Sequence, residues 1–182
     1  MIQINPREIA AEALMEIMTA DAYNTMTLRR LLRQNGAMSR QDRAFVTEVV
    51  NGTLRNLIYI DHVLNTFSKT KTEKMKPWLL AVLRTAVYQM YFMDVPDAAA
   101  CNEAVKLASV RGYGSLKGFV NGVLRTSQEL GADFLNLNYA AELDSPKKYA
   151  ALGGGFITLF PKLEMNVSVS SHISHTNNIS NG

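Results

Sequence analysis

The sequence predicts an all-α fold, a bundle of six helices arranged as two groups of three. Patterns typical of β-strands are nearly absent before residue 130, and apolar residues recur there at helical spacing. The segment Val50–Arg55 also returns as Val120–Arg125, with Val123 in place of Thr53 as the only difference. Because the two copies fall in the third and the sixth predicted helix, the chain divides into two similar halves.

The first half contains three predicted helices, each with a recognisable start or end. The first spans residues 6–19 and is capped by Asn5, a residue type preferred at that position. A short helix over residues 25–34 follows. Ser39 is expected to cap a long third helix over residues 40–67, because its apolar positions keep one helical period of about 3.6 residues throughout.

The second half begins with a helix over residues 77–93 that opens with proline. This helix is apolar on nearly every face and is therefore expected at the centre of the fold. Helices over residues 97–111 and 115–130 complete the bundle. Arg84 stands alone among the apolar residues of the central helix, so we expect it to pair with an acid, Asp61 or Glu103, with Asp61 favoured.

The repeated segment places a glycine inside two helices, where Gly52 and Gly122 each cost about 1 kcal/mol relative to alanine. One interpretation is coincidence together with two tight helix crossings, at which a missing side chain allows two backbones to approach. The other is a domain of two similar halves, each presenting an Asn and an Arg near a helix end. Asn51 is expected to be structural.

Composition permits several functions and requires none. The chain has 182 residues and a net charge of +3; residues 1–130 hold 16 Lys/Arg and 12 Asp/Glu, and residues 131–182 hold 3 and 4. This excess allows contact with phosphates. Cys101 is the sole cysteine, which excludes an internal disulfide. Its place on a predicted helix among alanines favours a small packing residue over a nucleophile. No apolar stretch is long enough for a membrane span, and we expect a cytoplasmic protein without a metal site.

The character of the chain changes after residue 130. Residues 166–182 contain no Asp, Glu, Lys or Arg and are mostly small or polar, a composition that predicts disorder. Gly153–Gly155 is a glycine cluster without the flanking pattern of a nucleotide-binding loop. We therefore expect a folded domain over residues 4–130 and an atypical tail over residues 131–182.

Four segments resemble the NusB family in their order and spacing. Ala81–Gln89 is similar to the central helix of that family, and the later segments Asp94–Pro96, Asn102–Ala108 and Phe119–Leu124 match as well. The resemblance covers residues 4–130. It implies a six-helix NusB-like bundle that binds RNA.

Within this family the sequence is most similar to the N-terminal RNA-binding domain of RsmB-type (Sun/Fmu) rRNA cytosine-C5 methyltransferases. Asp42–Phe45, Val50–Arg55 and Ile60–Leu64 resemble the third helix of those enzymes, and Arg125 ends the last segment as it usually does there. The free-standing antitermination factors of this family typically have a cluster of arginines at the N-terminus. Here the N-terminus has Arg7 alone, which also favours the methyltransferase branch. Two alternatives stay open: a free-standing antitermination factor with a ribosomal protein partner, and a module that binds only protein.

The resemblance to the methyltransferases implies a further domain that binds S-adenosylmethionine. Only 52 residues follow residue 130, too few for that domain, and Cys101 follows Ala100 where the catalytic cysteine would follow a proline. We therefore expect a catalytically silent chain without a cofactor. Our hypothesis is that it is a truncated or frameshifted gene product, which the genome sequence beyond the stop codon would test.

The chemistry open to such a domain is recognition of phosphates and bases, by cations and by polar or aromatic side chains. The expected partner is RNA, with small-subunit rRNA favoured, rather than DNA or a membrane. A ribosomal protein is a second candidate partner. The candidate RNA-binding residues are Arg7, Arg40, Arg43, Lys106, Arg111, Tyr113, Lys117, Asn121 and Arg125.

Overall fold

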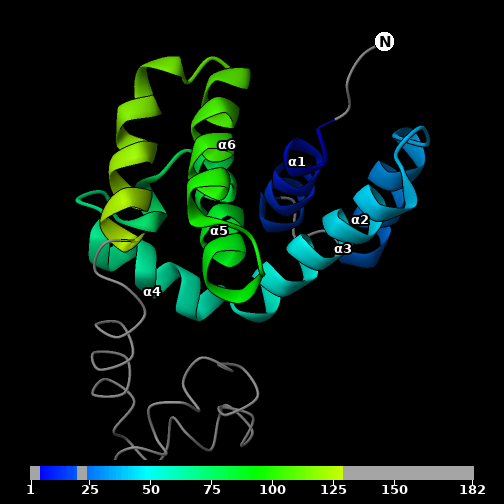
Figure 1. Cartoon of the computed structure of the whole chain (residues 1–182), viewed down its shortest axis with the longest axis horizontal. Helices are drawn as coiled ribbons and strands as arrows, with labels where there is room; N and C mark the ends of the chain where they lie inside the picture. Colours follow the sequence, from blue (N-terminus) through cyan, green and yellow to red (C-terminus); the bar gives the residue numbers. More distant parts are fainter. Residues whose placement is uncertain (1–4, 20–23, 129–182) are drawn as a thin grey trace, which may run out of the picture. The chain divides into compact units, whose positions relative to one another are not determined.

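The computed structural model describes residues 5–19 and 24–128, and its described residues form helices and no β-strand (Figure 1). The α-helices are α1 (Pro6–Thr19), α2 (Asn24–Gln34), α3 (Arg40–Arg55), α4 (Leu57–Phe67), α5 (Pro77–Phe92) and α6 (Asp97–Val110), and the 3-10 turns are η1 (Thr72–Lys74) and η2 (Gly114–Leu116). A further α-helix covers residues 117–128 and is called the last helix here. The predicted all-α class is confirmed. The expectations for residues 131–182 lie outside the described residues.

The helix starts follow the capping residues that the sequence predicts. The Asn5 side-chain oxygen accepts a hydrogen bond of 3.0 Å from the Arg7 amide at the start of α1. The Ser39 hydroxyl accepts one of 3.0 Å from the Asp42 amide at the start of α3. Pro77 opens α5, where its missing amide hydrogen costs nothing.

The single long helix predicted over residues 40–67 is wrong, because the structure divides it at Asn56 into α3 and α4. The Asn56 backbone leaves the helical region, with φ −108° and ψ 19°. Its side-chain amide and its backbone amide both donate to the carbonyl of Gly52, at 2.8 and 3.1 Å. These bonds close the final turn of α3 and allow α4 to begin in a new direction.

Helix α5 is central, as predicted. Every residue from Ala81 to Met90 is buried, and the helix contacts α1, α3, α4 and α6. The indole nitrogen of Trp78 donates to the carbonyl of Leu107 at 3.0 Å, which ties α5 to α6. Figure 1 shows α1, α2 and α3 as one group and α5, α6 and the last helix as the other, with α4 joining them.

The predicted partner of Arg84 is confirmed. Its Nε and Nη2 atoms each donate to an oxygen of Asp61 at 2.8 Å, one bond to each oxygen. Arg84 is buried and Asp61 is half-buried. A buried guanidinium without such a partner would be strongly unfavourable, so this pair connects α5 to α4.

The two copies of the repeated segment have different environments. A β-carbon at Gly52 would overlap the ring of Tyr88, so α3 and α5 approach closely there. A β-carbon at Gly122 would meet nothing within 4 Å, and that residue is exposed. The tight-crossing interpretation is therefore correct for the first copy and wrong for the second.

No helix in the described part of the chain combines the length and apolar character needed to cross a membrane.

Candidate nucleic-acid interface

The residues predicted to bind RNA fall into two classes in the structure. Arg7, Arg43 and Arg111 use their guanidinium groups for contacts inside the fold. The remaining candidates lie at the surface of α3, of α6 and of the segment that follows it.

Arg7 joins three helices. Its Nε donates to the side-chain oxygen of Gln89 on α5 at 2.8 Å, and its guanidinium carbon lies 5.1 Å from the ring centre of Phe45 on α3. A cation over an aromatic face is attracted by the electron density of the ring. Arg7 is half-buried in this position, so it holds α1 against α3 and α5.

Arg43 and Arg111 also hold neighbouring elements together. Arg43 donates to the carbonyl of Leu32 at 2.9 Å, near the end of α2. Arg111, which follows α6, forms an ion pair of 2.9 Å with Glu12 on α1 and lies 4.4 Å from the ring centre of Trp78 on α5. The RNA contacts predicted for Arg43 and Arg111 stay predictions. In the structure, each side chain connects its own segment to a neighbouring helix.

Three other candidates lie singly. Arg40 is the exposed first residue of α3, and its side chain has no hydrogen bond or ion pair among the described residues. Lys106 is exposed and forms an ion pair of 2.6 Å with Glu103 one turn earlier on α6. Tyr113 is half-buried in the turn before the last helix, and its carbonyl accepts the Leu116 amide at 2.9 Å.

Lys117, Asn121 and Arg125 form a row along the last helix, and we call these three residues the last-helix row. They are four positions apart, so they lie on one helical face, and all three are exposed. None of their side chains has a hydrogen bond or ion pair with another described residue. The structure thus places these three predicted site residues on one face of one helix.

The surface beside the last-helix row carries little side-chain bulk. Gly118 and Gly122 follow two of its members directly, and a β-carbon at either would meet nothing within 4 Å. A ligand backbone can therefore approach the helix closely between Lys117 and Arg125. Cations and an amide on such a surface suit a phosphate backbone with an accessible base.

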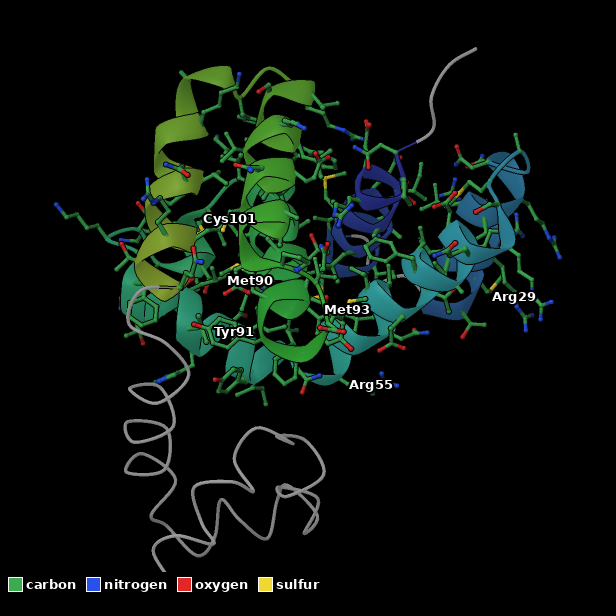
Figure 2. The ribbon with its side chains drawn as sticks, in the orientation of Figure 1. Arg29, Arg55, Met90, Tyr91, Met93 and Cys101 are labelled. Atoms are coloured by element: carbon green, nitrogen blue, oxygen red, sulfur yellow. The ribbon has the colours of Figure 1, made fainter. Side chains whose placement is uncertain are left out.

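The prediction of site residues left out a second cationic surface. Arg29, Arg30 and Arg33 lie on the outer face of α2, and all three are exposed. Figure 2 shows Arg29 at the outer edge of this helix. The spacing of these arginines along an amphipathic helix was the available signal.

Cys101 is a packing residue, as expected. It is buried on α6 with its sulfur 3.8 Å from that of Met90, and Figure 2 shows both on the side of α5 and α6 nearer the last helix. Burial, followed by the charge of Asp97, raises the pKa of its thiol and disfavours the reactive thiolate. Within residues 5–19 and 24–128, no three side chains of His, Cys, Asp or Glu are grouped to hold a metal ion.

Tyr91 fixes the far part of the last helix. Its hydroxyl donates to the backbone carbonyl of Ser127 at 2.6 Å. Burial is the main reason that the pKa of Tyr91 rises to about 12. Together with Arg111 before η2, this bond holds the segment that carries the last-helix row against the core.

Curated relatives of this chain are of two kinds. A probable ribosomal RNA small subunit methyltransferase B of Bacillus subtilis (strain 168) is 41% identical over 132 residues, which cover 72% of this chain and 29% of that protein. The transcription antitermination protein NusB of Acetivibrio thermocellus is 32% identical over 120 residues, covering 65% of this chain and 82% of that protein. The chain thus spans less than a third of the methyltransferase and most of the antitermination protein.

Solved structures share the fold. The NusB chain in a crystal structure of the antitermination factors NusB and NusE with double-stranded RNA aligns with a TM-score of 0.65 at 15% identity, covering 69% of this chain and 95% of that chain. NusB of T. maritima aligns with a TM-score of 0.63 at 21% identity, covering 72% and 95%. The model of the NusB family matches residues 4–129, which include all the described helices. The chain belongs to the NusB family.

Proposed function

We propose that this chain is an RNA-binding domain of the kind found at the N-terminus of rRNA cytosine-C5 methyltransferases, and that it is catalytically silent alone. The last-helix row carries the proposal, because it presents on one exposed face an amide and two cations whose side chains have no ion pair among residues 5–19 and 24–128. The identity is higher to the Bacillus subtilis methyltransferase than to the Acetivibrio thermocellus antitermination protein, which supports the methyltransferase branch. In this proposal the domain binds small-subunit rRNA, and the protein is located in the cytoplasm.

In this proposal Lys117 and Arg125 neutralise phosphates, and Asn121 between them reads a base edge. Phosphate contacts supply affinity for any sequence and weaken as salt rises, whereas base contacts set sequence preference. The folded domain is proposed to span residues 4–130, in line with the family match over residues 4–129. S-adenosylmethionine chemistry would belong to a further domain.

The test compares two variants that lose the same charge. Lys117→Gln/Arg125→Gln removes the cations of the last-helix row, and Lys69→Gln/Lys74→Gln removes two exposed lysines from the segment before α5. Electrophoretic shifts with small-subunit rRNA fragments at two salt concentrations should show weaker binding for the first variant, with a log–log salt slope flatter by about 1.4. Equal losses in both variants would contradict the proposed site.

One observation favours a second candidate, a free antitermination factor. The chain covers 82% of the Acetivibrio thermocellus antitermination protein, so it holds nearly everything that protein has. A boxA-like strand added to the same experiment separates the two candidates, because an antitermination factor should prefer it. Asn121→Ala should reduce whichever preference is found. A module that binds only protein would shift neither RNA.

A further inference from the structure

The outer face of α2 carries three arginines in the second half of the helix. Met26, Arg29, Arg30 and Arg33 stand at positions i, i+3, i+4 and i+7, so they share one side of the helix, and we call them the α2 face. The opposite side packs into the core through Thr27, Leu28 and Leu31, which are buried. This face is therefore presented outward by a helix that is firmly seated.

Among the described residues, one acid pairs with the three arginines of the α2 face. Arg30 forms an ion pair with Glu16 on α1, and its Nη1 donates to the side chain of Gln34 at 2.9 Å. The side chains of Arg29 and Arg33 have no hydrogen bond or ion pair with any described residue. Two guanidinium groups thus remain available, and the third is held in a fixed orientation beside them.

These side chains surround an open depression of about 620 Å³, lined by Met26, Thr27, Arg29, Arg30, Arg33 and Gln34. A docked amphipathic helix would need apolar anchors at such positions, and here only Met26 is apolar, with 71% of its surface exposed. A guanidinium group can donate two parallel hydrogen bonds to two oxygens of one phosphate. The chemistry of the face therefore suits a phosphate backbone better than an apolar protein partner.

The α2 face lies far from the last-helix row. Figure 1 shows α2 and the last helix at opposite ends of the helical unit. A domain of this size is about 35 Å across. A short RNA can contact one surface, and only a longer strand can contact both at once.

We propose that the α2 face is a second RNA-backbone site, which engages single-stranded RNA that is already held by the last-helix row. The inference rests on the proposed function. Two contacts on one strand make the second binding event intramolecular, so their combined affinity exceeds that of either alone. The contribution of α2 should therefore depend on RNA length and be independent of sequence.

The test uses the double variant Arg29→Gln/Arg33→Gln, since both side chains are exposed and neither has a hydrogen bond or ion pair within the described part of the chain. Its matched control is Lys69→Gln/Lys74→Gln. Affinities are measured with strands of about 5 and about 30 nucleotides of one small-subunit rRNA sequence, at several salt concentrations. For the long strand, the α2 variant should bind at least about ten-fold more weakly, with a salt slope flatter by about 1.4. For the short strand, it should bind within about two-fold of wild type.

The contrary outcomes separate the two proposals. Equal losses in the α2 variant and its control, or equal losses with both strands, would overturn the α2 site while leaving the last-helix row intact. An unchanged affinity for the long strand would do the same and would reassign the face to an acidic protein. Wild-type affinity in Lys117→Gln/Arg125→Gln with both strands would overturn the proposed function, and this inference with it.

Discussion

Tyr88 on α5 occupies the space that a side chain at Gly52 on α3 would need. The tyrosine is 4% exposed, its ring stacks on Phe92 with centroids 5.4 Å apart, and its hydroxyl donates to Glu48 at 2.6 Å. A ring held from three sides cannot swing away at little cost. The close approach of α3 and α5 therefore depends on glycine at position 52.

Gly52→Ala should lower the free energy of unfolding by about 1–3 kcal/mol, the usual effect of overpacking a core. Gly122 is the matched control, because it occupies the same position in the second copy of the repeated segment and a β-carbon there would meet nothing within 4 Å. Gly122→Ala should raise the stability by up to about 1 kcal/mol through helix propensity alone. Urea unfolding of both variants measures the difference, and equal effects at the two positions would contradict the structure.

The Arg84–Asp61 pair should behave as a unit. Asp61→Ala leaves a buried guanidinium without its carboxylate, so we expect a loss of about 2–4 kcal/mol, with the half-exposed position of Asp61 reducing the cost. Arg84→Met/Asp61→Leu should recover most of this loss, because it removes both charges. A double-mutant cycle by thermal or urea unfolding gives the coupling energy, and additive single effects would argue against the pair.

Arg111 is expected to contribute more to stability than to RNA affinity. Arg111→Gln removes the ion pair with Glu12 and the stacking on Trp78, which together should cost about 1–2 kcal/mol. The salt slope of RNA binding should stay within error of wild type, in contrast to the variant of the last-helix row. A flatter slope with unchanged stability would restore the sequence-based assignment of Arg111 as a phosphate contact.

Stability should fall steeply at alkaline pH. A tyrosine in the unfolded chain ionises with a pKa near 10. In the folded chain, burial raises the pKa of Tyr91 to about 12. Burial, together with the hydrogen bond to Glu48, also raises the pKa of Tyr88 to about 12. Between these values the unfolded state loses its protons first. The free energy of unfolding is therefore fully retained below about pH 10 and declines as the pH rises toward 12.

Tyr91→Phe isolates one of these contributions. The variant should be less stable near neutral pH, because the carbonyl of Ser127 loses its donor, and its stability should decline less between about pH 10 and pH 12. Urea unfolding at about pH 8 and about pH 11 compares the two proteins. Parallel declines would show that Tyr91 titrates normally in the folded state.

The sequence predicts the starts of α1, α3 and α5 because the signals are local. Asn5, Ser39 and Pro77 act on their own first turns, so nothing distant can override them. The break at Asn56 was missed because the apolar period continues through it. At the break, the side-chain and backbone amides of Asn56 both bond to the Gly52 carbonyl, and the apolar period does not register such bonds.

The candidate site is less predictable because a charge in a sequence does not reveal what lies beneath it. Gly52 and Gly122 occupy local sequences that differ at one of six positions, and in the structure it is Tyr88 on another helix that distinguishes their surroundings. Arg7 and Arg125 are equally basic in sequence. Phe45 and Gln89, both remote from Arg7 along the chain, give it a place within the fold.

The anchoring of the last helix has a consequence for the entropy of RNA binding. Before this helix, Arg111 is fixed by its ion pair with Glu12 and its contact with the ring of Trp78. Beyond Arg125, the Tyr91 hydroxyl bonds to the carbonyl of Ser127. The backbone beneath the last-helix row is thus preorganised before a ligand arrives. Association need then immobilise only the side chains of the row, at about 0.5–1.5 kcal/mol each, without ordering a loop or folding a helix.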